Sequence, residues 1–334
     1  MSLSIIIVNY KSEKFIYNCI KSALEYSPMP EAEWLVVDNS ENRNEANSII
    51  NDFPFVKYIR LKQNEGYGRA NNEGAKFAKG ETLLFLNPDC LFFDESFSIC
   101  YNRFRESSHI ACGVSLVYED GSFQNSGHRF FPLGLNHLLS IPYYGSFLKW
   151  IAKIFNSQRP SYPNPSNEQF VDWISGAFLM VKRDAFELAG GFDPDFFLYS
   201  EEIELCYRLK KLGTAVIYGD LKIIHLEGKS INSATNSSDQ SYLNLYEIKG
   251  RQLILSNLLR IRKQYGISGL LFHFLNYWIS LPIYMISFFI ISILKLNFNA
   301  SNFRRMTGYI ANIIAVSGFL PRLIGNKPFL YKVL

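Results

Sequence analysis

The chain has 334 residues, of which 48% are hydrophobic and 19% are charged, so it can bury a large core and is not globally disordered. This length allows one large α/β domain with an appendage. A net charge of only +4, without a lysine-rich block, argues against nucleic acid as the main partner. The five cysteines are scattered without CxxC spacing, which argues against a disulfide framework or a zinc site and favours a reducing compartment.

Short apolar runs alternate with helix-length segments over about the first 110 residues. The apolar N-terminus lacks a basic region and a small-residue cleavage site, so we interpret it as a first strand rather than a signal peptide. The β-α-β-α order predicts a mostly parallel sheet with right-handed crossovers, covered by helices on both faces. The expected strands are 4–9, 34–38, 56–61 and 82–87, and the expected helices are 12–27, 44–53 and 68–79.

This rhythm breaks at residues 130–168, where aromatic, proline and apolar residues mix without a clear period. That segment is either an insertion on the acceptor side or an amphipathic surface segment. A strand pattern returns at 170–182, interrupted at Ser175-Gly176-Ala177. Beyond it we expect helices at 183–189, 203–212 and 242–263, short strands at 215–218 and 222–225, and a Ser/Asn-rich loop at 231–240.

The C-terminal region differs in kind, because residues 264–294 contain no Asp, Glu, Lys or Arg. A bilayer is crossed by roughly 20 apolar residues, so this stretch is long enough. Basic residues flank it on both sides, which disfavours a single crossing. A re-entrant hairpin hinged near Pro282, helices lying in the interface, or a second span over 306–320 would keep both flanks on one side. A single span and a soluble cap or dimer face are the alternatives.

Several polar residues follow the expected strands and can carry chemistry. Asp38 ends the second strand, where a carboxylate can accept hydrogen bonds from a nucleobase or a ribose. An Asx-turn or a helix cap is the structural alternative. The segment 64–74 opens a helix after a strand, where backbone N–H groups can meet phosphate and Arg69 can pair with a diphosphate; an ordinary turn is the alternative. Asp89 follows a strand too apolar to be exposed, at the edge where open α/β sheets bind ligands.

Further along the chain stand two adjacent acids and a histidine. Glu201 and Glu202 begin a helix after an aromatic approach, and an apolar wall raises a carboxylate's pKa toward that of a useful base. Acids in a first helical turn also favour the macrodipole, which is the structural alternative. His225 ends a β-rich run and is either a metal ligand or a structural histidine.

Taken in order, these stretches resemble the family 2 glycosyltransferases, which are inverting enzymes of the GT-A fold. The most similar branch is the bacterial rhamnosyltransferase-like group of O-antigen and cell-wall synthesis. The resemblance covers most of residues 3–230 and little of the C-terminal third. The matching stretches are 4–10, 36–40, 64–74, 84–89, 173–177, 191–208, and His225 with Gly228 and Ser230.

The resemblance implies roles for single residues. Asp89 would bind Mg²⁺ or Mn²⁺ with His225 as a possible second ligand, although Asn87 stands in place of the first acid of the metal motif. Glu201-Glu202 matches the family's Glu-Asp pair, so Glu202 is the expected base and Glu201 an alternative. The expected nucleotide-sugar contacts are Asn9, Asp38, Asn64, Gly66, Arg69 and Asn87, with Trp173 and Gly176 in the donor or acceptor pocket.

The resemblance also implies an organisation and a reaction. Residues 1–240 would be a GT-A catalytic domain, with a nucleotide-binding half (1–110) and an acceptor half (111–240), and residues 241–334 a helical membrane-associating region. The expected reaction moves L-rhamnose from dTDP-L-rhamnose to a polyprenyl-diphosphate-linked glycan at the cytoplasmic face of the membrane. A UDP-hexose or UDP-N-acetylhexosamine donor and a non-catalytic scaffold are alternatives. A nucleotidyltransferase would need a basic glycine-rich loop, which residues 9–12 lack.

Overall fold

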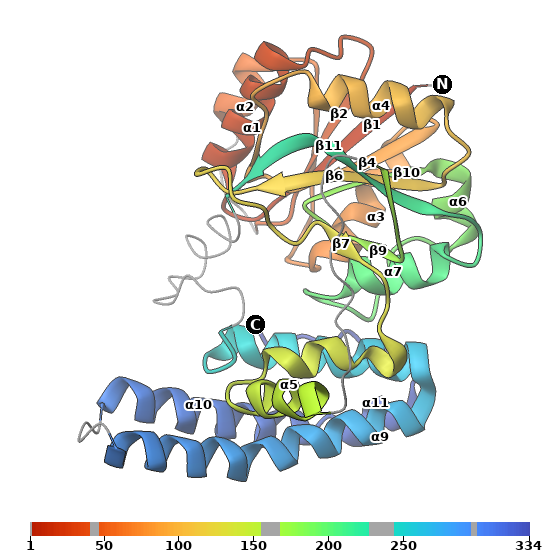
Figure 1. Ribbon diagram of the computed structural model, residues 1–334. Helices are drawn as coiled ribbons and strands as arrows, with labels where there is room; N and C mark the ends of the chain where they lie inside the picture. The colour runs from red at the N-terminus through yellow and green to blue at the C-terminus, as the bar shows by residue number, and fades with distance from the viewer. Residues whose placement is uncertain (1, 41–46, 155–167, 227–243, 295–298) are drawn as a thin grey trace. The chain divides into compact units, whose positions relative to one another are not determined.

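A computed structural model describes residues 2–40, 47–154, 168–226, 244–294 and 299–334 (Figure 1). The expected loop at 231–240 and the motif residues Gly228 and Ser230 lie outside the described residues. The chain forms two compact units. Unit 1 consists of Met1–Arg129, Pro163–Phe197 and Glu201–Tyr242, and unit 2 of Phe130–Tyr162, Leu198–Ser200 and Leu243–Leu334.

Unit 1 is built on a mixed sheet whose first half is parallel. The strands β1 (Leu3–Asn9), β2 (Glu33–Asp38), β3 (Val56–Arg60) and β4 (Thr82–Leu86) lie where the apolar runs predict them. They are parallel, in the order β3-β2-β1-β4. The carboxyl ends of these strands therefore meet at one edge of the sheet.

The second half of the sheet departs from the simple parallel pattern. Strand β10 (Phe178–Lys182) is antiparallel to both of its neighbours, β4 and β6 (Ala111–Val117). The two strands expected at 215–218 and 222–225 form one strand, β11 (Ala215–His225), with a register shift between Tyr218 and Lys222. The short strands β5 (Cys90–Leu91) and β8 (Glu168–Val171) pair with β11, while β7 (Gly127–His128) and β9 (Trp173–Ile174) form a separate pair.

Alternation along β1 explains how helices cover both faces of the sheet (Figure 1). Leu3, Ile5 and Ile7 join a core with α1 (Glu13–Tyr26) and α4 (Ser96–Glu106). Ile6 points the other way, toward α3 (Tyr67–Phe77), where a Cβ on Gly74 would lie 2.6 Å from Ile6 Cγ2. The remaining described helices of unit 1 are α2 (Asn47–Asp52), α6 (Arg183–Leu188) and α7 (Glu201–Leu209).

Unit 2 is helical and includes the segment that lacks a sequence period. That segment contains the 3₁₀ stretch η1 (Pro132–Ser140) and the helix α5 (Tyr144–Ile154). The helix expected at 242–263 begins later and continues much further, as α9 (Ile248–Leu294). The backbone of α9 leaves helical geometry at Gly266 and stays helical through Pro282, so the expected hinge near Pro282 is wrong.

Helix α9 packs along α10 (Ala300–Ser317), which is followed by α11 (Leu320–Gly325). The hydroxyls of Ser280 and Tyr309 lie 2.7 Å apart, and the rings of Tyr284 and Tyr309 stack at 5.6 Å. Among the described residues α9 is the one helix that is long and apolar enough to cross a membrane, by length and composition alone.

Candidate active site

Asn9 and Asp38 form one buried cluster where β1 and β2 end. The two residues are direct neighbours in the parallel register. Asn9 Nδ2 donates to Asp38 Oδ1 at 3.2 Å and to Glu13 Oε1 at 3.0 Å. The backbone N–H of Ser40 also donates to Asp38 Oδ1, at 3.1 Å, which is the expected Asx-turn. Asp38 thus holds the turn together, and its contact with a nucleobase stays a prediction.

A second cluster shapes the loop before α3. Asn39 Nδ2 donates to Asn64 Oδ1 at 2.9 Å, and Asn64 Oδ1 also accepts from the backbone N–H of Gly66 at 3.1 Å. Gly66 has a φ of +89°, and a Cβ there would lie 2.3 Å from the carbonyl oxygen of Phe197. Only glycine fits this crossing of two backbones. Gly66 is therefore required by the loop itself, whether or not the loop binds phosphate.

Arg69 is engaged within unit 1. Its Nε donates to the carbonyl oxygen of Pro194 at 2.7 Å, and its Nη1 lies 3.4 Å from Glu65 Oε2. These contacts tie α3 to the acidic loop before α7. The ion pair with Glu65 is long and about a third exposed, so it is easily exchanged for another anion. The role of Arg69 toward a diphosphate stays a prediction.

Asp89 and His225 are brought together at the carboxyl edge of the sheet. Asp89 follows β4, His225 ends β11, and their side chains are 2% and 10% exposed. The backbone N–H of Leu226 donates to the carbonyl oxygen of Asp89 at 2.9 Å, which fixes the two segments to each other. His225 Nε2 lies 3.5 Å from Asp89 Oδ1.

The hydrogen bonds of Gln124 determine which nitrogen of His225 carries the proton. Gln124 Nε2 donates to the backbone oxygen of His225 at 2.6 Å, so its Oε1, 2.8 Å from Nδ1, is an acceptor. In its neutral form His225 therefore donates from Nδ1 and presents the lone pair of Nε2 toward Asp89. Asn87 Nδ2 also approaches Nε2, at a long 3.5 Å.

This donor set fits a divalent cation. A carboxylate oxygen and the lone pair of a neutral imidazole repel when they face each other, and a shared cation removes that repulsion. Both are ligands of Mn²⁺-type ions, and the Gln124 contact is the outer hydrogen bond that orients a metal-binding histidine. No cluster of three or more His, Cys, Asp or Glu side chains that could hold a metal occurs in the described part of the chain. A cation held by Asp89 and His225 would thus need further ligands from water or a substrate.

Glu201 and Glu202 occupy different environments at the start of α7. Glu201 is 4% exposed, and its Oε2 has no hydrogen-bond partner among the described residues. Burial, followed by the neighbouring charge of Glu202, raises the pKa of the Glu201 carboxyl well above its ordinary value. Glu202 is half-buried and its side chain covers Gly176, where a Cβ would lie 3.5 Å from Glu202 Cγ. Glu201 therefore tends to keep its proton, and Glu202 is the better candidate base.

The Ser175-Gly176-Ala177 turn connects these two places. Tyr67 Oη donates to the carbonyl oxygen of Gly176 at 3.1 Å, while the carbonyl oxygen of Ala177 accepts from Asn87 N at 2.9 Å. Gly176 thus lies under Glu202, and its neighbour holds the turn that carries Asp89. Trp173, in β9, is buried and precedes the same turn.

Three residues of these clusters have no role in the sequence prediction. Asn39 directly follows Asp38, and Tyr67 directly follows Gly66, so both lie inside motif stretches. That position is the sequence signal that could have identified them. Gln124 has no such signal, because it is 101 residues away from His225 in the chain.

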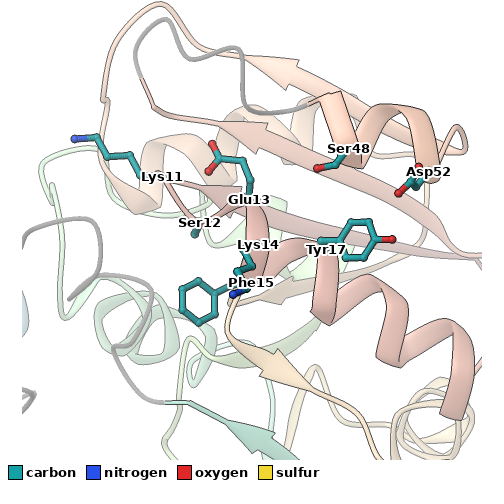
Figure 2. Close-up of a pocket in the computed structure, with 8 residues that line it drawn as sticks. All are labelled: Lys11, Ser12, Glu13, Lys14, Phe15, Tyr17, Ser48 and Asp52. Atoms are coloured by element: carbon teal, nitrogen blue, oxygen red, sulfur yellow. The ribbon is translucent and has the colours of Figure 1, made fainter.

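The structure also has a hollow that the sequence does not indicate (Figure 2). It lies at the N-terminal end of α1, beside α2, and its lining includes Lys11, Glu13, Tyr17 and Asp52. Glu13 connects it to the Asn9–Asp38 cluster through the hydrogen bond from Asn9. A hydrogen bond to Asp52 raises the pKa of the Tyr17 phenol. None of the predicted site residues lines this hollow.

Comparison with known proteins identifies the family. A family described as Glycosyl transferase family 2 matches residues 4–187, which is more than half of the chain. The chain belongs to this family. The match confirms the resemblance, and it ends before Glu201 and His225, so the roles of those two residues depend on geometry.

Curated relatives of this family 2 protein are similar at modest identity. The low-salt glycan biosynthesis hexosyltransferase Agl10 of Haloferax volcanii is 30% identical over 215 residues, covering 63% of this chain and 62% of that protein. The N-acetylglucosaminyl-diphospho-decaprenol L-rhamnosyltransferase of Mycobacterium tuberculosis is 26% identical over 198 residues, covering 55% and 62%. The matched stretches therefore span less than two thirds of these relatives.

The fold is shared with solved structures. The mannosyltransferase PcManGT from Pyrobaculum calidifontis, in complex with GDP-Man and Mn²⁺, has a TM-score of 0.55 at 13% identity. The likeness covers 96% of this chain and 86% of that one. The GT-A type fold expected from the sequence is confirmed, as a mixed and mostly parallel sheet flanked by helices.

Proposed function

We propose that this family 2 protein is an inverting glycosyltransferase that moves a sugar from a nucleotide-sugar to a hydroxyl group of a lipid-linked glycan. The observation that carries the proposal is the junction around Gly176 and Ala177. Gly176 lies beneath Glu202, and Ala177 holds the turn that carries Asp89, which faces His225. One turn thus connects a candidate base with a candidate place for a metal-held diphosphate.

The proposed mechanism is one in-line displacement. Glu202 accepts the proton of the acceptor hydroxyl, and the oxygen forms its bond to the anomeric carbon as the bond to the diphosphate breaks on the opposite face. The anomeric configuration inverts, and the nucleoside diphosphate leaves. A divalent cation held by Asp89 and His225 would offset the charge that develops on the leaving group. Arg69 would add to this by exchanging its ion pair with Glu65 for the diphosphate.

Glu201 has a separate role in this proposal. Because its carboxyl is buried and tends to stay neutral, it places no second negative charge beside Glu202. Glu202 is therefore the acid to which we assign the base role. Asn9, Asp38, Asn64, Gly66 and Asn87 would contact the nucleotide-sugar, and Trp173 and Gly176 would line the pocket.

The donor and acceptor are proposed from the relatives. A relative named for L-rhamnose transfer to a diphospho-decaprenol-linked sugar supports dTDP-L-rhamnose and a polyprenyl-diphosphate-linked acceptor. Such an acceptor lies in a membrane, and the length and apolar composition of α9 support attachment of residues 241–334 to it. The cytoplasmic face is part of the proposal, because the nucleotide-sugar donor is made there. Residues 1–240 would carry the catalysis.

A donor screen on the purified full chain tests this function. Nucleoside diphosphate release is followed with dTDP-L-rhamnose, UDP-hexoses and UDP-N-acetylhexosamines, with Mn²⁺ or Mg²⁺ or EDTA, and with and without a lipid-extract acceptor. Acceptor-dependent release from one donor that EDTA abolishes is the expected result, and it names the sugar. Donor binding without release under every condition would contradict the proposal and favour a non-catalytic scaffold.

A further inference from the structure

Charge is unevenly divided between the two units. Unit 2 contains 14 Lys and Arg residues against a single acid, Glu247, a formal charge of +13. Unit 1 contains the remaining 20 basic residues and 29 acidic residues, a formal charge of −9. The net charge of +4 is therefore the sum of two units whose formal charges have opposite signs. One carboxylate cannot neutralise fourteen cations, so unit 2 keeps a large excess of positive charge, which favours an anionic partner.

Unit 2 also presents large apolar side chains to the outside. Along α9, the exposed residues recur every three or four positions from Leu271 to Ile293, which places them in a stripe along the helix. The buried residues of the same segment include Tyr277, Leu281 and Tyr284, and the last of these stacks on Tyr309 of α10. The stripe includes Leu271, Leu275, Trp278, Ile286, Phe289 and Ile293, each more than a third exposed.

Helix α5 of the same unit has the pattern of a helix at a membrane interface. Phe147, Trp150 and Ile154 follow one another at helical spacing and are 42%, 60% and 59% exposed. Lys149 and Lys153 are exposed between them, and α5 contains no acid. Aromatic and aliphatic residues beside lysines are typical of helices that lie in the headgroup region.

Contacts recorded within unit 2 hold α5 to α9 (Figure 1). Tyr144 Oη, in the first turn of α5, hydrogen-bonds to Asn276 Oδ1 of α9. The ring of Tyr143 meets that of Tyr284 edge-to-face at 5.0 Å. The two helices therefore belong to one packed body, although α5 comes from the middle of the chain and α9 from its C-terminal part.

We propose that α5 and the outer stripe of α9 form a single surface that binds one leaflet of an anionic membrane without crossing it. This extends the membrane attachment in the proposed function, on which it rests, to a named surface and a headgroup charge. The occupant is a leaflet and not a second copy of the chain, because two copies of a unit with a formal charge of +13 repel each other. Crossing is disfavoured because α10, packed along α9, carries the exposed Arg304 and Arg305 near its start.

Vesicle flotation of the purified full chain tests this surface. Vesicles of phosphatidylcholine alone are compared with vesicles containing about a third of phosphatidylglycerol, at low salt and at about 0.5 M salt, where charges are screened within a few ångströms. We expect binding to the anionic vesicles at least about tenfold tighter at low salt, with most of that difference lost at high salt. Equal binding to both vesicle types at both salt concentrations would overturn the proposal.

Two sets of variants separate the apolar and the ionic contributions of α5. Trp150→Glu should weaken binding to both vesicle types, whereas Lys149→Gln with Lys153→Gln should weaken only the binding to anionic vesicles. The matched controls lie in unit 1: Leu188→Glu, at a leucine that is 77% exposed, and Lys62→Gln with Lys79→Gln, at exposed lysines. An α5 variant that binds like its control would overturn the assignment of α5 to the surface.

The test also distinguishes this proposal from the proposed function. Nucleotide-sugar binding by unit 1 is measured on the same samples in solution. Loss of vesicle binding with donor binding intact in Trp150→Glu is the expected result. A vesicle-independent dimer that Trp150→Glu dissociates would instead identify the occupant as a second copy and overturn the lipid assignment. Absence of donor binding in the unaltered chain would count against the transferase alone.

Discussion

His225 Nε2 faces Asp89 Oδ1 at 3.5 Å, and the Gln124 contact selects the neutral tautomer in which that nitrogen directs its lone pair at the carboxylate. Two electron-pair donors held this close and this deeply buried stabilise a cation between them better than they stabilise each other. This contact brings together the end of β4 and the end of β11, two strands that are distant in sequence. It is the structural reason to expect metal-dependent chemistry from a chain with a reduced metal motif.

The first prediction concerns the carboxylate of this pair. Asp89→Asn keeps the shape of the side chain but removes its charge, so nucleoside diphosphate release should fall at least about a hundredfold at saturating Mn²⁺. Asp120→Asn, in an exposed turn of unit 1, is the matched control and should release diphosphate at the unaltered rate. Full activity with an unchanged Mn²⁺ requirement in Asp89→Asn would refute the metal site.

Gln124 is predicted to act through His225. In Gln124→Leu the imidazole loses the partner that fixes its tautomer, so the half-saturating Mn²⁺ concentration should rise about 10- to 100-fold. The maximal rate at saturating metal should change little, because Gln124 touches no proposed ligand other than His225. A Mn²⁺ titration of the rate separates these two quantities. A reduced maximal rate with unchanged metal affinity would show that Gln124 has only a structural role.

The third prediction assigns the base. Glu202→Gln cannot accept a proton, so the turnover rate should fall about 10²- to 10⁴-fold while donor binding is retained. Donor binding is measured by calorimetry and turnover by diphosphate release, on the same preparation. Glu106→Gln, at a side chain that is 76% exposed, is the control. If Glu202→Gln turns over normally while Glu201→Gln does not, the base is Glu201.

How far the sequence predicts this fold depends on the element. Strands β1 to β4 are long apolar runs bounded by turn residues, so their positions follow from local pattern. The antiparallel direction of β10 does not, because a strand's own residues do not encode which neighbours it pairs with. Helix α5 does not follow from the sequence pattern, because its exposed aromatic residues and the preceding prolines obscure the helical period.

The site divides in the same way. Asp89, Glu202 and His225 can be predicted from the sequence, since each lies just after a strand, at the end of a strand or at the start of a helix. Their partners depend on contacts between distant segments, as with Gln124 and His225 or Tyr67 and Gly176. Arg69 is a further example, because its hydrogen bond to the Pro194 carbonyl oxygen cannot be inferred from its position in the sequence.

The loop before α3 allows a matched test of backbone constraint. Gly66→Ala adds a Cβ within 2.3 Å of the Phe197 carbonyl at a φ of +89°, so both strain and overlap should lower the free energy of unfolding, by about 3 kcal/mol. Gly121→Ala has a similar φ of +79° with nothing within 4 Å, so it should cost only about 1 kcal/mol. Urea unfolding measures both, and equal losses would refute the overlap.

The last prediction concerns the pH dependence of stability. Burial and Glu202 raise the pKa of Glu201 in the folded chain above that in the unfolded chain. Between these two pKa values the folded state binds the extra proton, so the free energy of unfolding falls as pH rises through that window. Glu201→Gln removes this proton-linked loss, since the amide stays neutral at every pH. The variant should therefore gain thermal stability relative to the unaltered chain as pH rises above the ordinary carboxyl range, and little below it. Melting temperatures measured from acidic to alkaline pH check this, with Glu106→Gln expected to follow the unaltered chain. A constant difference between Glu201→Gln and the unaltered chain across the range would show that Glu201 does not hold a proton in the fold.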